Sequence, residues 1–110
     1  MIDKKEHISK LIESLKFFRE KPGMLFNNAL ECKRFLDGMR FMATHVDLVP
    51  HEQYKDVYRE VAALYGWTWV ANSFYLQMVD QGSEDNQIID NLMKVEIEVW
   101  EKLLDMLSEE

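Results

Sequence analysis

Histidine, cysteine and carboxylate side chains are the groups in this sequence with the chemistry to bind a metal or to act as a nucleophile, acid or base. The three histidines are His7, His45 and His51. None lies three or four residues from another histidine or closes a Glu-x-x-His pair, the spacings that place two ligands on one helix face. His45 and His51 flank a connection containing Asp47, where an exposed or capping imidazole is the usual finding. We therefore predict no metal site.

The other reactive groups lack the surroundings that catalysis requires. Cys32 falls on an apolar stripe, where burial raises the pKa of a thiol and keeps it unreactive. Glu52 and Asp56 lie four residues apart beside Lys55 and Arg59, a pattern typical of a solvated helix face. The sequence has no G-x-x-x-x-G-K-[ST], G-x-G-x-x-G or G-x-S-x-G motif. We predict that the chain is not an enzyme and that it uses no cofactor.

Cysteine content also bears on the compartment. With Cys32 as the only cysteine no intramolecular disulfide is possible, and seven methionines favour a reducing environment. Residues 1–20 alternate charged and apolar side chains, without the apolar core and small-residue cleavage site of a signal peptide. We expect a cytoplasmic protein.

Charge is distributed unevenly along the chain. Residues 1–59 hold 11 Lys or Arg against 9 Asp or Glu, a balance of +2, whereas residues 60–110 hold 2 against 11, a balance of −9. The second half should present a negative field that steers a basic protein partner and disfavours nucleic acid. The same clustering is also typical of a solvated face that keeps a small protein soluble. The predicted partner-binding residues are Asp80, Glu84, Asp85, Asp90, Glu98 and Glu101, and the acidic face is expected to include some of the four acids Glu96, Glu98, Glu101 and Asp105.

Helices must position these side chains, because apolar residues recur at helical spacing along most of the chain. The 110 residues fit one domain, residues 1–110, and their 47% apolar content with only 4 Gly and 2 Pro favours a packed helical protein. Asp3 and Glu6 form a capping signal for a helix over residues 4–20, which Pro22 and Gly23 end.

A second helix follows the same logic, with Asn28 and Glu31 as its start and His45 near its end. Pro50 suits the first turn of a third helix that ends near Gly66. The apolar stripe of the second helix consists of Ala29, Cys32, Leu36, Met39 and Ala43, widened by Phe35, Met42 and Val46.

A fourth helix is predicted from Trp67 to Val79, with Gln81 and Gly82 as its C-cap and Ser83 as the next N-cap. It is the most buried candidate, because residues 61–79 carry no charge. These 19 positions match a membrane span in length. Polar residues interrupt the run and acidic residues flank it, so we interpret it as core and not as a transmembrane helix.

The last predicted helix covers residues 84–107. Within it, residues 95–99 alternate like a strand, but the pattern is helical on both sides and favours a helix with a broad apolar face. Five helices joined by short connections predict an all-α domain, either an irregular or an orthogonal bundle.

Several segments resemble small all-helical immunity-like proteins of bacterial toxin systems. Residues 18–26, with Pro22, Gly23 and Met24, are similar to that family's R-P-G-M-Y-L-G segment, and residues 35–41, with Gly38, are similar to its F-L-x-G-Y segment. The pair Gly66-Trp67, the acidic entry at residues 83–85 and the terminal stretch 103–107 fit the same layout. Lys21 stands where the family has arginine, and Met39 replaces an aromatic residue. The resemblance implies a protein that binds and neutralises a cognate toxin domain.

The motif residues also have structural interpretations. Pro22 and Gly23 form a turn, Met24 is expected to tuck into the core, and Gly38 is expected to let another helix approach closely. The family motif therefore marks a fold more than a function.

Three functional hypotheses follow. The first is an immunity or antitoxin-like inhibitor that binds a basic toxin domain, such as a nuclease, through the acidic surface. The second is a small regulatory or scaffolding protein that forms a homodimer or binds a helix in a groove of methionine and aromatic side chains. The third, an enzyme or ligand-binding bundle, requires a pocket lined by Trp67, Trp69, Phe74 and Tyr75, which at this spacing are more typical of core.

Overall fold

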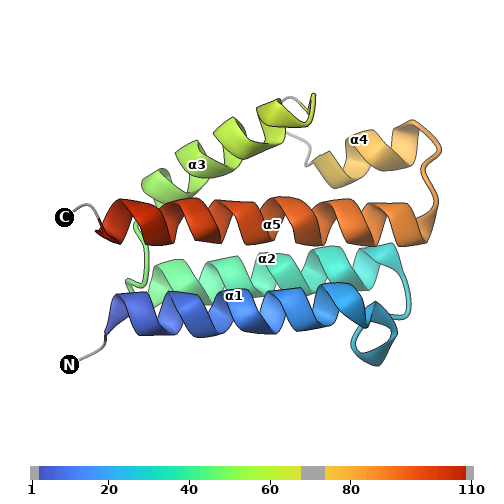
Figure 1. The fold of residues 1–110 in the computed structure, drawn as a ribbon. Coiled ribbons are helices and arrows are strands. Elements are labelled where there is room, and N and C mark those ends of the chain that lie inside the picture. Colours follow the sequence, from blue (N-terminus) through green and yellow to red (C-terminus); the bar gives the residue numbers. More distant parts are fainter. Residues whose placement is uncertain (1–2, 68–73, 109–110) are drawn as a thin grey trace.

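A computed structural model describes residues 3–67 and 74–108 of the chain (Figure 1). The described residues confirm the predicted all-α class and contain no β-strand. In chain order the elements are α1 (Lys4–Glu20), the short 3-10 helix η1 (Pro22–Met24), α2 (Ala29–His45), α3 (His51–Leu64), α4 (Phe74–Asp80) and α5 (Asp85–Ser108).

The long helix α5 forms the centre of the domain. It lies between α1 and α2 on one side and α3 and α4 on the other, and it packs against all four (Figure 1). Trp100, Val99 and Met93 on this helix are completely buried. Residues 95–99 are helical, as predicted, and their alternating pattern arises because α5 is covered from several directions.

Side-chain caps begin α1 and α2 where the sequence predicts them. The carboxylate of Asp3 accepts a hydrogen bond from the backbone N–H of Glu6 at 3.3 Å. The side chain of Asn28 accepts one from the N–H of Glu31 at 2.9 Å. Each bond satisfies a backbone donor in the first turn that has no intrahelical partner, which fixes where the helix starts.

Left-handed residues end three of the helices. Gly66 follows α3 with φ 81°, and Gly82 follows α4 with φ 77°. In both places the next residue's N–H reaches back to a carbonyl five residues earlier, which is the Schellman arrangement. Asp47 has the same role after α2 with φ 61°, although it is not glycine. The predicted N-cap at Ser83 is wrong, because α5 begins two residues later, at Asp85.

The predicted fourth helix, Trp67 to Val79, is described only in part. Residues 68–73 lie outside the described residues, and the described α4 has only seven residues. Met78 is buried, but Leu76 is 39% exposed and Val79 is 43% exposed, so α4 is not the most buried helix. α5 has that position because it is longer and lies between the others. None of the helices in the described parts of the chain combines the length and the apolar character needed to cross a bilayer.

Two predictions from the family-like segments are also wrong. Met24 is 69% exposed and does not enter the core. Gly38 does not mark a close helix contact, because a Cβ added there would meet no atom within 4 Å. The result at Gly38 follows from the way α1 and α2 pack on α5, which leaves open space between them.

Asp47 gives a test of the helix-ending geometry. The left-handed conformation costs an L-residue roughly 1–2 kcal/mol, and glycine avoids this cost. Glycine also has more conformational freedom in the unfolded chain, which offsets part of the resulting stabilisation. We expect Asp47→Gly to be more stable than Asp47→Ala by about 1 kcal/mol in urea unfolding. Both variants remove the same charge, so equal stabilities would contradict the assigned backbone strain.

Candidate functional site

The six predicted partner-binding carboxylates form two groups in the structure. The first group is exposed around the turn between α4 and α5 and consists of Asp80, Glu84 and Asp85. The second lines a cavity of about 450 Å³ between α1 and α5 and consists of Asp90, Glu98 and Glu101. The acidic segment is therefore divided between two places.

Cations on α1 pair with two carboxylates of the second group. Arg19 Nε lies 2.9 Å from Asp90 Oδ1, and a second guanidinium nitrogen lies 3.5 Å from Oδ2. Lys16 Nζ lies 3.5 Å from Glu101 Oε2. The hydrogen bond to Asp90 is the main reason that the pKa of Arg19 is raised. The positive first half of the chain thus partly neutralises the negative second half, which charge counting along the sequence could not show.

Glu98 in the same group interacts with residues from two other places. It accepts a hydrogen bond from the hydroxyl of Tyr65, which follows α3, and this bond raises the pKa of the Tyr65 hydroxyl. Lys94 lies 4.4 Å from the centroid of the Tyr65 ring. Glu98 therefore helps to attach the end of α3 to α5.

Asp80, Glu84 and Asp85 differ from the second group, because none of them forms an ion pair with a described residue. The turn that holds them is tight, since Gly82 is left-handed and α5 begins three residues later. Beside it on α4 lie the exposed apolar side chains Leu76 and Val79. The turn between α4 and α5 therefore presents unpaired negative charge next to apolar surface.

Glu96 is one of four acids of which only some were expected on the acidic face, and it does not lie there. The residue has 0% relative exposure and is a charged residue within the core. Its spacing in the sequence contains the signal: Glu96 lies three residues after Met93 and four before Trp100, both of which are core residues. A carboxylate in that register points inward with its apolar neighbours.

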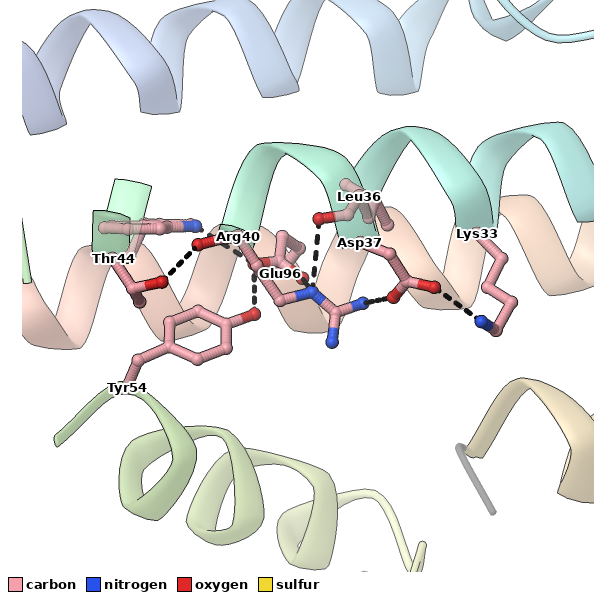
Figure 2. A network of polar contacts seen from close by, with 8 residues as sticks. Lys33, Leu36, Asp37, Arg40, Thr44, Tyr54 and Glu96 are labelled. Atoms are coloured by element: carbon pink, nitrogen blue, oxygen red, sulfur yellow. Dashed lines mark hydrogen bonds and ion pairs between the residues drawn. The ribbon is translucent and has the colours of Figure 1, made fainter. Parts of the chain in front are cut away.

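Buried donors from two elements surround the Glu96 carboxylate (Figure 2). The hydroxyl of Tyr54 on α3 donates a hydrogen bond to Glu96 Oε2 at 2.5 Å. The indole Nε1–H of Trp100, one turn along α5, donates to the same oxygen at 3.0 Å. The other oxygen, Oε1, lies 3.6 Å from Nε of Arg40 on α2, which makes an ion pair without a hydrogen bond. The network joins α2, α3 and α5 at one point.

The network continues along α2 through Asp37 to Lys33, whose side chains are partly exposed (Figure 2). Arg40 lies 2.9 Å from Asp37, and Asp37 lies 2.5 Å from Nζ of Lys33. The guanidinium of Arg40 also donates to the carbonyl of Leu36 at 3.2 Å and lies 5.3 Å from the centroid of the Tyr58 ring. Arg40 therefore connects the buried carboxylate to partly exposed charges.

Burial sets the protonation behaviour of this network. It raises the pKa of Glu96, and the charge of Arg40 and the hydrogen bonds from Tyr54 and Trp100 only partly oppose it. Burial also raises the pKa of Tyr54 and Tyr58, and the nearby Glu96 carboxylate raises both further. Burial lowers the pKa of Arg40, but the surrounding negative groups raise it more, so Arg40 stays charged.

A carboxyl group with a raised pKa is what general acid catalysis requires, but access decides its use here. A neighbouring cavity of about 480 Å³ is lined by Arg40, Tyr54, His51 and Lys55 among others, and Glu96 does not reach it. Because Glu96 is completely buried, a substrate in that cavity would meet the Arg40 and Tyr54 side chains instead. The geometry favours a structural role for the carboxylate.

The other sequence candidates have ordinary surroundings. Cys32 is completely buried, as predicted, and burial followed by the nearby Glu96 raises the pKa of its thiol to about 12. Trp67 and Tyr75 are partly buried against the core, while the side chains of Trp69 and Phe74 lie outside the described residues. Cys32 therefore remains a protonated core thiol at neutral pH.

His45 stacks on Phe41 with ring centroids 5.6 Å apart. Within residues 3–67 and 74–108, no three His, Cys, Asp or Glu side chains gather as a metal site would need.

Comparisons of the chain with protein-family models, with curated proteins and with solved structures give no match. The resemblance to immunity-like proteins, which rests on the short segments around Pro22 and Gly38, therefore stays a prediction.

Titration of Glu96 should be visible in the stability of the protein. The pKa of Glu96 is raised in the folded state above the ordinary glutamate pKa of 4.5. The free energy of unfolding should therefore fall as the pH rises from 4.5 towards the pKa that Glu96 has in the folded protein. The loss amounts to about 1.4 kcal/mol for each unit by which the pKa is raised. We expect Glu96→Gln to lack this decrease in urea unfolding measured across that range. An exposed control, Glu52→Gln, should keep it, and parallel profiles for the native chain and Glu96→Gln would contradict the assignment.

A double-mutant cycle tests whether Arg40 and Glu96 act as a pair. Removing one member of a buried pair typically costs about 3–5 kcal/mol, because the other charge is left uncompensated. We expect Glu96→Leu and Arg40→Met each to lower the free energy of unfolding by about 3 kcal/mol, and the double variant to lose at least about 1 kcal/mol less than their sum. Additive losses would show that the 3.6 Å approach carries no coupling.

Proposed function

We propose that this chain is a non-catalytic cytoplasmic binding protein that neutralises a basic protein domain, in the manner of the immunity-like proteins it resembles. The observation that carries the proposal is the turn between α4 and α5. There Asp80, Glu84 and Asp85 are exposed, lie within six residues and form no ion pair with a described residue. Unpaired charges of one sign steer an oppositely charged partner and speed its association.

Apolar side chains beside the turn support a binding role over a purely solvated one. Leu76 and Val79 on α4 are 39% and 43% exposed, close in sequence to Asp80. Protein interfaces combine apolar anchors, which supply most of the affinity, with charged rims, which supply orientation and rate. The α4–α5 turn offers both within ten residues, 76–85.

The second group of carboxylates has a smaller part in this proposal. Asp90, Glu98 and Glu101 extend the negative surface along α5, but each already interacts with a described residue of α1 or with Tyr65. A partner would have to compete with these contacts, and its net gain would be small. The proposed contact surface is therefore centred on the α4–α5 turn.

A binding assay with a charge-matched control tests the proposal. The probe is the C-terminal domain encoded by the neighbouring upstream reading frame, and binding is measured by calorimetry at about 50 mM and about 200 mM salt. We expect tight binding that weakens with salt, and at least about tenfold weaker binding for Asp80→Asn/Glu84→Gln/Asp85→Asn at low salt. The control Glu13→Gln/Glu52→Gln/Asp56→Asn removes the same number of negative charges from exposed positions on α1 and α3 and should bind like the native chain.

Two results would contradict the proposal. The first is no detectable binding to the probe. The second is equal weakening by both triple variants, which would show that net charge acts and not the α4–α5 turn. Because Glu84 and Asp85 are favourably placed at the start of α5, the unfolding of each variant should be measured alongside.

A further inference from the structure

An open groove lies between α1 and α2. Both helices pack on α5 and not closely on one another. The space between them forms two adjoining cavities, of about 560 Å³ and about 450 Å³. The two cavities share Leu11, Ser14, Met39 and Met42, so they are one continuous groove.

The groove has the length and the lining of a helix-binding site. Along α1 it extends from Lys4 to Phe18, which at 1.5 Å per residue is about 21 Å, or about four helical turns. Its lining is mainly apolar, and Met42 and Val46 in it are 54% and 55% exposed. Methionine side chains are flexible and adapt to the surface of a bound helix. At Gly38 there is room for an incoming side chain, since nothing lies within 4 Å of a Cβ built there.

Charges around the groove indicate which kind of helix it fits. The groove is lined by three basic side chains, Lys4, Lys10 and Arg34, and by one acidic side chain, Asp47. The chain as a whole has a net charge of −7. Lys10 pairs with Glu6 at 3.1 Å across two exposed side chains, whereas Lys4 and Arg34 form no ion pair with a described residue. The rim of the groove is therefore positive on a negative protein.

We infer that the groove binds an amphipathic helix of another protein, with apolar residues spaced i, i+3, i+4 and i+7 and with Asp or Glu on its flanks. A second copy of this chain is a poor occupant. Its strongly acidic helix is α5, and most apolar residues of α5 are buried in its own core, with Met106 near the end of the helix 39% exposed. The inference goes beyond the proposed inhibitor function, because the groove and the α4–α5 turn have opposite charge and lie on different helices.

Two synthetic peptides test the inference directly. Each is a helix of about 18 residues with leucines at the stated spacing. One carries glutamate at the flanking positions and the other carries lysine. In fluorescence anisotropy at low salt, we expect the acidic peptide to bind at least about tenfold more tightly than the basic one. No binding of the acidic peptide, or equal binding of the two, would overturn the inference.

Neighbouring residues on α2 provide matched variants. Gly38→Leu fills the groove, and it should preserve the fold because leucine favours helix more than glycine does. Met42→Ser removes an apolar side chain from the groove, and Phe41→Ser removes one that is 66% exposed but lies outside it. We expect at least about fivefold weaker peptide binding for the first two and unchanged binding for Phe41→Ser.

The same variants separate a partner helix from self-association. If all three bind the acidic peptide equally, the groove is not the site and the inference fails. Sedimentation of the native chain should show a monomer at the concentrations used. A dimer that Gly38→Leu converts to monomer would instead assign the groove to a second copy and overturn the choice of occupant.

Discussion

The need to satisfy a carboxylate on the most buried helix constrains how α2 and α3 pack on α5. Glu96 on α5 receives hydrogen bonds from Tyr54 on α3 and Trp100 on α5, and it faces Arg40 on α2. A charge in the core is tolerated only when partners hold it, and two of the partners, Tyr54 and Arg40, come from other helices. The positions of α2 and α3 relative to α5 are thus specified by directional contacts in addition to apolar packing.

The arrangement around α5 also determines what is left for binding. α1 is attached to α5 by ion pairs from Arg19 and Lys16, and α2 by Arg40. Both helices pack mainly on α5 and only loosely on each other, so a groove remains between them. The same ion pairs occupy Asp90 and Glu101 of α5, whereas Asp80, Glu84 and Asp85 at the α4–α5 turn form none with a described residue. Internal electrostatics therefore separate a positive groove from a negative turn.

The sequence was most informative where a local interaction decides the structure. Asp3 and Asn28 predicted helix starts, and Gly66 and Gly82 predicted helix ends, because capping depends on residues a few positions apart. Contacts between distant residues were not predictable in this way. The pairing of Arg19 with Asp90 joins residues 71 positions apart, and no local pattern encodes it. Glu96 is an intermediate case, since its register with Met93 and Trp100 indicated burial but gave no sign of Tyr54 or Arg40 as partners.

An NMR titration of the glutamate side-chain carboxyl carbons in the native protein tests whether the buried network around Glu96 organises the fold. If the buried network organises the fold, Glu96 should titrate above the exposed glutamates, and the Trp100 indole N–H should exchange slowly with solvent. If Glu96 titrates together with the exposed glutamates and the indole N–H exchanges rapidly, the carboxylate is solvated and the account is wrong.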